Sequence, residues 1–511
     1  MTPKDSPLFE PVLWQGDGFN ILNELLLPGR IEYIHVTEVA QALDAVRDMK
    51  TRAFGQVLTF LYSGALVARG YQDKKAMPLD TQLGELTQRF CAVRPTFDFK
   101  GLGEFYSQWL AELPADVDAG PWVEARAREM AATIMSLRQA RAKRAAAALP
   151  QRARLLTHCN VSGELVAVAL YCREMGKEIS VIATETRPYL QGTRLTAWEL
   201  ARAGIDVSLI PDCAIAQVMA SGAVQAVIVG SDRCARNGDI INKVGTYPLA
   251  LMAREYKLPF YALVQYPGNL ADGADVEIEE RPREELVKFQ GQSLLEDDGD
   301  EIGVRYPAFD VTPADLITCL IGFEDDLTPE NFRAKHHGQS KKTQRREPNA
   351  GKYLLVYGMP QPSGYEGLAR ALKIEKAKSV LVPEMRPQLW GAHVVARELV
   401  KRRMPTTLIS DSMMGALFAQ REILRLYLFC HEVAGHGAQG ITGSLLASHL
   451  ARAHGVPVEL LEGNGENAVP LDQDVSTFLG EKVLPRGVSV EPLRTEMIPP
   501  LVVRPGTGVG P

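Results

Sequence analysis

The sequence predicts an α/β protein in which an N-terminal mixed helical and β domain precedes two Rossmann-like parallel-sheet domains related by internal duplication. Two observations support this fold class. From Arg152 onward, short apolar runs alternate with helical stretches, which is typical of parallel strands buried on both faces. The 28 residues that begin at Glu185 align without gaps with those that begin at Glu384, and 11 positions are identical, so we expect one fold to be repeated.

Apolar spacing predicts helices over 36–49 and 54–70, and an Ala- and Arg-rich helix over 119–148. Strands are expected at 152–159, 178–185, 205–212, 224–232 and 258–265, and again at 352–358, 378–384, 404–411, 424–430 and 456–462. The predicted divisions are 1–125 for the N-terminal α+β domain, 126–330 for the first Rossmann-like domain, 331–350 for a basic linker, 351–485 for a degenerate repeat and 486–511 for a C-terminal tail.

Composition narrows the classes of partner. The net charge of -6 over 511 residues gives no general attraction to nucleic acid or an anionic membrane. The basic stretch Arg333–Lys352 could be a nucleic-acid tail, but it lacks interleaved aromatic residues, so a linker is favoured. No apolar run has the roughly 18–20 residues of a membrane helix, and no secretion signal is visible. Seven scattered cysteines without a CxxC pair favour a cytoplasmic location and disfavour a metal site.

Polar residues cluster where the predicted parallel strands end. Cys159, Glu185, Asp212 and Asp232 all lie at carboxyl ends, the edge at which such sheets bind ligands. The segment "GSDRCARNGDIINK", from Gly230 to Lys243, is expected to be a charged loop between a strand and a helix. The sequence therefore predicts a ligand site at this edge.

The two repeats differ at the positions where chemistry is expected. With the register of the repeat, Asp232 becomes His431, Asn242 becomes Ile441 and Lys243 becomes Thr442, and the counterpart of "THCNVSG" is "GMPQPSG", without cysteine. The residues that recur, among them Arg187 as Arg386 and Asp212 as Asp411, are expected to have structural roles. We therefore expect the first repeat to be the active one.

Two further segments resemble known binding motifs. In "HEVAGH" (431–436) the second histidine falls at i+5 and not i+4, which disfavours a zinc-protease helix. The segment "GHGAQG" (435–440) fits GxGxxG, follows a strand and has Glu459 about twenty residues on, so a nucleotide site is one alternative. The other is that it merely replaces "RNGDIIN" in the repeat.

Several long motifs occur in order: "LWQGDGFNILNELLLPGRIEYI", "LTHCN", "TRPYLQGTRLTAWEL", "GSDRCARNGDIINKVGTYPLA", "VEIEERPREEL" and "YPAFDVTPADLIT". Together they resemble the methylthioribose-1-phosphate isomerase family of methionine salvage over about residues 12–325. That family is related to ribose-1,5-bisphosphate isomerases and to regulatory subunits of a translation-initiation exchange factor. The resemblance implies an aldose–ketose isomerase that acts on a sugar 1-phosphate without metal or cofactor.

The resemblance also implies roles for individual residues. Cys159 and Asp232 would be the catalytic pair, with Cys159 favoured as a thiolate by a helix N-terminus. The substrate would be bound by Arg52, Arg94, Gln191, Asn242 and Lys243. Because members of the family pair through the Rossmann-like domain, a homodimer is possible, or the second repeat could act as an intrachain pseudo-dimer partner.

Alternatives remain open from the sequence. Cys159 could be an ordinary core cysteine, Asp232 a helix N-cap, and His158 a neighbour that shapes the loop. The family usually has Arg-Gly-Ala-Pro where this chain has "RAFG" at Arg52–Gly55, which leaves the substrate's identity open. One alternative is an isomerase that acts on another pentose 1-phosphate, such as ribose 1,5-bisphosphate or a 5-deoxypentose 1-phosphate. The other is a non-catalytic protein that senses a sugar phosphate or a nucleotide.

Overall fold

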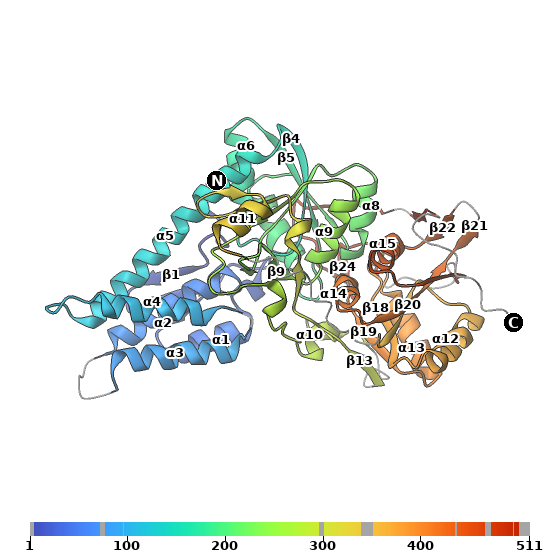
Figure 1. The fold of residues 1–511 in the computed structure, drawn as a ribbon, viewed down its shortest axis with the longest axis horizontal. Helices are drawn as coiled ribbons and strands as arrows, with labels where there is room; N and C mark the ends of the chain where they lie inside the picture. Colours follow the sequence, from blue (N-terminus) through green and yellow to red (C-terminus); the bar gives the residue numbers. More distant parts are fainter. Residues whose placement is uncertain are drawn as a thin grey trace.

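The computed structural model describes residues 5–71, 77–95, 97–295, 301–338, 351–434, 437–464, 472–493 and 495–499. An elongated N-terminal helical unit, a central parallel sheet and a second parallel sheet follow one another along the long axis of the molecule (Figure 1). The predicted α/β class is confirmed. No helix in these ranges is both long enough and apolar enough to cross a bilayer.

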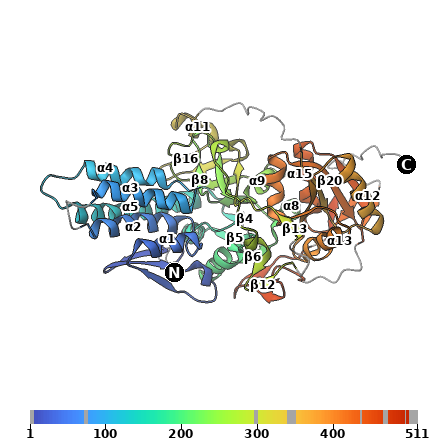
Figure 2. The same ribbon diagram turned by 90° about the horizontal axis from the view of Figure 1, so that it is seen from below.

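The N-terminal unit joins a small antiparallel sheet to a bundle of helices (Figure 2). The strands are β1 (Val12–Gln15), β2 (Gly18–Leu22) and β3 (Tyr33–Val36), and the helices are α1 (Val39–Arg47), α2 (Phe54–Arg69), α3 (Leu79–Val93), α4 (Phe99–Ala111) and α5 (Ala119–Ala148). Helix α2 packs along α5, burying Phe60 and Leu61 in a core shared with Phe90 and Phe99. Helices α1, α2 and α5 were predicted, whereas α3 and α4 were not.

The first large sheet has the strand order β16-β15-β10-β7-β4-β5-β6-β26. Its members are β4 (Arg152–Thr157), β5 (Glu178–Thr184), β6 (Val207–Ile210), β7 (Ala226–Val229), β10 (Phe260–Leu263), β15 (Cys319–Ile321), β16 (Asp326–Leu327) and β26 (Ser489–Val490). All are parallel except the β15–β16 pair, and all five predicted strands are present. Helices α6 (Glu164–Glu174), α7 (Trp198–Arg202), α8 (Ile215–Ala220) and α9 (Thr246–Glu255) connect them.

The second large sheet is wholly parallel and has the order β13-β19-β18-β17-β20-β23. Its strands are β13 (Ile302–Val304), β17 (Tyr353–Tyr357), β18 (Ser379–Pro383), β19 (Thr406–Ile409), β20 (Ile423–Cys430) and β23 (Val458–Glu462). Helices α12 (Pro362–Ile374), α13 (Arg397–Lys401), α14 (Met414–Ala419) and α15 (Ser444–His454) connect them. The five strands expected in the repeat are therefore confirmed as elements.

The two sheets exchange edge strands. Strand β13 leaves the first unit and pairs with β19, while β26 leaves the second unit and pairs with β6. Strands β6 and β19 occupy equivalent places in the two repeats, so the exchange is reciprocal. Strand β26 lies within residues 486–511, so this part of the expected tail is an ordered edge of the first sheet. Residues 339–350 of the predicted linker and 500–511 of the tail lie outside the described residues.

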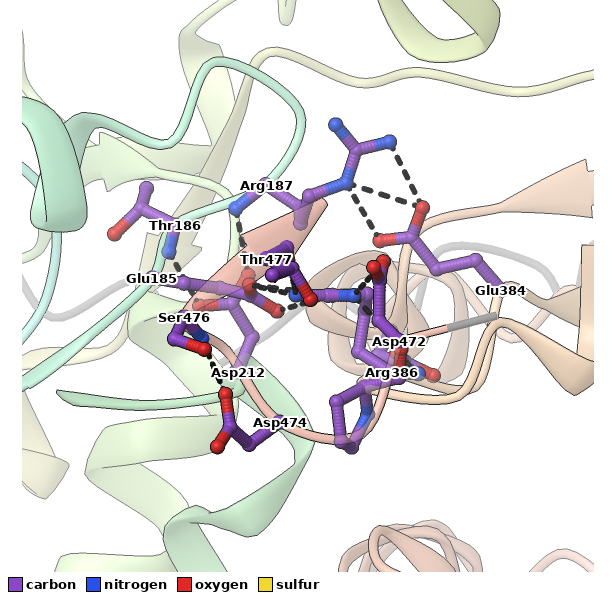
Figure 3. Close-up of polar contacts among 12 residues, drawn as sticks. Glu185, Thr186, Arg187, Asp212, Glu384, Arg386, Asp472, Asp474, Ser476 and Thr477 are labelled. Atoms are coloured by element: carbon purple, nitrogen blue, oxygen red, sulfur yellow. Dashed lines mark hydrogen bonds and ion pairs between the residues drawn. The ribbon is translucent and has the colours of Figure 1, made fainter. Parts of the chain in front are cut away.

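Two crossed ion pairs join the units where β5 and β18 end. Arg187 Nη2 lies 2.9 Å from Glu384 Oε2, and Arg386 Nη2 lies 2.9 Å from Glu185 Oε2 (Figure 3). All four side chains are at most 1% exposed. Because each glutamate accepts from the arginine of the other repeat, the contact has the reciprocity of a two-fold interface between identical subunits.

Backbone hydrogen bonds hold the same two turns in place. Asp212 accepts from the Thr186 and Arg187 N–H groups at 2.7 and 2.8 Å, and Asp411 accepts from Met385 and Arg386 at 3.2 and 2.8 Å. The structural roles predicted for the recurring arginines and aspartates are consistent with these contacts. The recurrence of elements and contacts supports the predicted duplication.

Removal of one partner of a crossed pair should destabilise the fold strongly, because the other charge is then left buried and unpaired. We expect Arg187→Met to lower the free energy of unfolding by about 3–5 kcal/mol, measured by urea titration. Arg30→Met is the control, because the Arg30–Glu32 pair is 66% and 50% exposed and should change stability by less than about 1 kcal/mol. Equal effects of the two substitutions would contradict this assignment.

Candidate functional site

The segment expected to be a loop folds as a β-hairpin. Strands β8 (Arg233–Cys234) and β9 (Ile240–Lys243) are antiparallel, and β9 also pairs with β14 (Phe309–Thr312). The prediction of a loop between Gly230 and Lys243 is therefore wrong, because part of the segment pairs as strands. Because Asn242 and Lys243 are on a strand in the middle of a small sheet, both side chains are buried and fixed next to the carboxyl edge of the first large sheet.

Cys159 follows β4 in a strained backbone conformation. Its φ of 68° lies in the left-handed region, which non-glycine residues rarely adopt. Its N–H donates to Thr186 Oγ1 at 2.9 Å, and its carbonyl accepts from Thr196 Oγ1 at 2.6 Å. Two hydroxyl groups thus hold the backbone of this residue, which an ordinary core cysteine does not require.

Asp232 follows β7 and is held by both of its backbone groups. Its N–H donates to the Ile241 carbonyl at 3.0 Å, and its carbonyl accepts from Gln265 Nε2 at 2.6 Å. The N-cap alternative is wrong, because α9 begins after Gly245 and its first N–H groups donate to Asp310. The carboxylate of Asp232 is therefore not used as a helix cap.

Three buried cations converge on this pair. Arg52, Arg94 and Lys243 are each at most 5% exposed. Burial raises the pKa of Cys159 and of Asp232; the charges of Lys243 and Arg52 oppose the rise for Cys159, and those of Lys243 and Arg94 oppose it for Asp232, so these cations lie within electrostatic reach of the pair. Arg52 Nε and Arg94 Nε have no hydrogen-bond partner among the described residues. Such a set of cations suits a phosphate.

The polar ligands expected for the sugar are also buried. Gln191 precedes the π-helix η3 (Gly192–Ala197) and is 5% exposed. Asn242 donates from Nδ2 to Thr246 Oγ1 at 3.0 Å. Both are on segments that border the cysteine or the aspartate, so the structure brings the predicted site residues to one edge of the sheet.

Burial has the largest effect on the pKa of both Cys159 and Asp232. It raises the pKa of the Cys159 thiol to about 12, and the nearby Asp232 carboxylate also acts to raise it, against the opposing effect of Lys243. The thiol is thus protonated at neutral pH, and the expected thiolate is wrong, since α6 begins only at Glu164 and burial outweighs the cations. Burial also raises the pKa of Asp232 and lowers that of Lys243.

The loop "RAFG" keeps the backbone shape that a glycine would favour. Ala53 adopts φ 43° and ψ -115°, and the next residue, Phe54, begins α2 and stacks against the Arg138 guanidinium at 4.1 Å. A positive φ is strained for alanine, so Ala53 adopts this conformation at an energetic cost.

Sequence reasoning missed the acids that face the binding arginines. Glu24 accepts from the Arg52 N–H at 2.9 Å, and its Oε2 lies 3.6 Å from Arg52 Nη1. Glu279 Oε2 lies 3.6 Å from Arg94 Nε. Burial raises the pKa of Glu24 to about 7 despite the charge of Arg52. Glu24 and Glu279 both lie within the motifs quoted above, but only the fold places them against Arg52 and Arg94.

The described residues of the second repeat form no such site. The Asp232 N–H bonds to Ile241, whereas the His431 N–H bonds to Gln439, so the hairpin is one residue shorter there. With this register, Gly440 and Ile441 become the counterparts of Asn242 and Lys243, and the polar groups are still absent. Gly358, at φ 87°, stands in the place of Cys159, and a Cβ on it would lie 2.1 Å from the Phe429 carbonyl.

The two other motifs take different structures. His431 is followed by strand β21 (Glu432–Ala434) and not by a helix, so "HEVAGH" lacks the zinc-protease geometry. Gly437–Gly440 of "GHGAQG" form strand β22, while Gly435 and His436 lie outside the described residues. No group of three or more His, Cys, Asp or Glu in the described ranges could hold a metal ion.

A separate open hollow of about 760 Å³ lies at the opposite, amino ends of β4 and β5. Arg152, Arg154, Arg173 and Lys177 line it, but these cations already contact carboxylates, a hydroxyl or carbonyl groups. It shares no residue with the site around Cys159.

Comparison with known proteins agrees with this fold. The chain belongs to the initiation factor 2 subunit family, whose model matches residues 56–322 and 354–460. Within it, the chain is 36% identical over 324 residues to the methylthioribose-1-phosphate isomerase of Albidiferax ferrireducens, which covers 60% of this chain and 90% of that protein. It is 33% identical to the isomerase of Pelotomaculum thermopropionicum over 65% of this chain and 96% of that one.

Two solved structures are similar. The 5-methylthioribose 1-phosphate isomerase of Pyrococcus horikoshii has a TM-score of 0.57 and 29% identity, and covers 66% of this chain and 98% of its own. The translation initiation factor eIF-2B subunit delta of A. fulgidus has a TM-score of 0.52 and 31% identity, with coverages of 62% and 96%. One neighbour is thus named as an enzyme and the other as a subunit of an initiation factor.

Anion binding should weaken as Glu24 ionises, because its carboxylate then competes for Arg52. Glu24 has a raised pKa of about 7, so it is protonated at pH 6 and charged at pH 8. We expect sulfate, which stays dianionic throughout, to bind several-fold more weakly at pH 8 than at pH 6, measured by calorimetry. Glu24→Gln should reduce this dependence, and a variant that keeps the full wild-type dependence would refute the role of Glu24.

Proposed function

We propose that the chain is an aldose–ketose isomerase that converts 5-methylthioribose 1-phosphate to 5-methylthioribulose 1-phosphate in methionine salvage. The proposal depends mainly on one observation: the buried thiol of Cys159 and the carboxylate of Asp232 lie within electrostatic reach of the buried Lys243. The isomerases named above, at 33–36% identity over nearly their whole length, support the same reaction. Arg52, Arg94 and Lys243 provide the charge that a sugar phosphate requires.

The chemistry requires two groups of different proton affinity. The anomeric oxygen of the substrate is esterified, so the ring cannot open by simple loss of a hydroxyl proton. A proton donated to the ring oxygen allows the bond from C1 to that oxygen to break. A proton then leaves C2 and another reaches C1, while the C2 hydroxyl loses its proton and becomes the ketone; direct transfer of the C2 hydrogen as hydride gives the same product.

Cys159 and Asp232 can supply these steps. Burial keeps the thiol protonated, and a raised pKa makes Asp232 a better base than an exposed carboxylate. Lys243, close to both, stabilises negative charge that develops on either group or on the substrate oxygens. The buried surroundings exclude water from the intermediate.

The rival function is a non-catalytic sensor of sugar phosphates or nucleotides, since one structural neighbour is an initiation-factor subunit. A sensor needs the cations but neither an anchored cysteine nor a nearby carboxylate of raised pKa. Ribose 1,5-bisphosphate and 5-deoxypentose 1-phosphates remain alternative substrates for the same chemistry.

Substitution of either catalytic group should abolish turnover without unfolding the protein. We expect Cys159→Ser and Asp232→Asn each to lower kcat for methylthioribose 1-phosphate by at least about 100-fold. Cys172→Ser, a buried thiol on α6, is the control and should retain activity. If the wild type converts ribose 1,5-bisphosphate faster than methylthioribose 1-phosphate, ribose 1,5-bisphosphate is the preferred substrate. If it converts no pentose 1-phosphate, the sensor function is favoured.

We further propose that the second Rossmann-like unit is an intrachain pseudo-dimer partner. The crossed ion pairs and the exchanged edge strands give a pseudo-two-fold contact within one chain. Helices α8, α9, α14 and α15 pack together across it.

The seven cysteines are all free, in agreement with the proposed cytoplasmic location.

The intact chain should therefore be monomeric, because its pairing face is already covered. Sedimentation of the purified protein is expected to give one chain of 56.1 kDa at micromolar concentration. A form that lacks residues 340–511 should self-associate through the uncovered face. Equal self-association of the two forms would count against the pseudo-dimer.

A further inference from the structure

The turn Glu185–Arg187 connects the second unit to the catalytic cysteine. Glu185 and Arg187 are the two residues of this turn that form the crossed ion pairs with Arg386 and Glu384. Thr186, between them, accepts the Cys159 N–H at 2.9 Å through Oγ1. One three-residue turn therefore contacts the second unit through its outer residues and the active site through its central one.

The turn is held rigidly enough to transmit this contact. The Thr186 N–H donates to Asp212 at 2.7 Å, and the Glu185 N–H donates to the Ile210 carbonyl at 2.9 Å. Gly192 packs so closely above it that a Cβ would lie 1.8 Å from the Thr184 carbonyl and 2.9 Å from Thr186 Oγ1. All of these groups are buried, so the position of the Thr186 hydroxyl is tightly defined.

The difference between the repeats is an independent observation. The scaffold of the turn recurs in the second repeat, where Glu384, Arg386 and Asp411 make the equivalent contacts. The two hydroxyls that hold the Cys159 backbone do not recur, because Met385 replaces Thr186 and Val395 replaces Thr196. Hydroxyl groups occur at these positions only in the repeat that has the cysteine, so the scaffold alone does not require them.

We propose that the second unit supports catalysis in the first: through the crossed Arg–Glu pairs it fixes the Glu185–Arg187 turn, and Thr186 on that turn positions Cys159. Thr186 and Glu384 are thus positioning residues, and the proposal rests on the proposed catalytic role of Cys159. The strained φ of 68° at Cys159 needs such support, since without the Thr186 acceptor its backbone would relax toward a common conformation. The degenerate repeat then retains a function although it has no site of its own.

The test measures kcat, KM and the alkylation rate of Cys159 by iodoacetamide at pH 9, followed by mass spectrometry of its peptide. Thr186→Val removes the acceptor, Thr186→Ser restores it, and Glu384→Gln removes the charge that the second unit contributes. We expect Thr186→Val and Glu384→Gln to lower kcat about 10- to 100-fold with KM changed less than about threefold. The alkylation rate should change at least threefold, and Thr186→Ser should recover most of the wild-type values.

Two control variants separate positioning from general loss of stability. Met385→Val alters the equivalent buried residue of the second turn, and Glu422→Gln removes another ion pair between the units, that with Arg305 at 2.7 Å. Both should leave kcat and the alkylation rate near wild type.

Wild-type kcat and alkylation rate in Thr186→Val would overturn the proposal, as would equal losses in the control variants. If Glu384→Gln fails to fold, the Thr186→Val and Thr186→Ser pair decides. If the wild type turns over no pentose 1-phosphate, the proposed function fails, but the alkylation rates still test whether the turn positions Cys159.

Discussion

The reciprocal burial of two arginines and two glutamates is the constraint on which the rest of the structure depends. Removing four charges from water costs several kcal/mol for each ion unless every donor and acceptor is satisfied. Each arginine here meets a glutamate of the other repeat and the carbonyl of the proline that follows it, and the turn behind it donates to an aspartate. Each unit therefore provides buried partners for charges of the other, and Arg386 has a further partner in Asp472 of its own unit.

The crossed ion pairs and the candidate site share one edge of the first large sheet. The same carboxyl edge of β4, β5 and β7 that carries the ion pairs also carries Cys159 and Asp232. Parallel strands place all these groups at one edge, where strand ends and helix starts offer backbone donors. Burial at this edge raises the pKa of both Cys159 and Asp232.

The comparison of the repeats shows which residues serve the fold and which serve chemistry. Glu, Arg and Asp in the turns are retained in both, because both turns make the same interface. Cys159, Asn242, Lys243 and the hydroxyls around the cysteine are found only in the first repeat. Tyr357 replaces His158, and its hydroxyl bonds to the Thr442 carbonyl as the His158 ring bonds to that of Val244. That histidine position is structural in both repeats.

The sequence by itself determined the α/β class, ten strands of the two large sheets, the repeat and the set of polar residues at the strand ends. These follow from local periodicity and from matches along the chain, which need no knowledge of contacts. Helices α3 and α4 were not predicted; they pack with α2 around an aromatic core that includes Phe60, Phe90 and Phe99.

Only the tertiary structure decided that "GSDRCARNGDIINK" is a hairpin, that the sheets exchange edge strands and that Glu24 faces Arg52. It also decided that the thiol of Cys159 is protonated and that the Thr186 hydroxyl holds its backbone. The reason is physical. Strand pairing and hydrogen bonding across long sequence separations depend on which surfaces meet, and a pKa depends on the water and charges around a group after folding. Neither the long-range pairing nor the pKa values can be predicted from local sequence patterns.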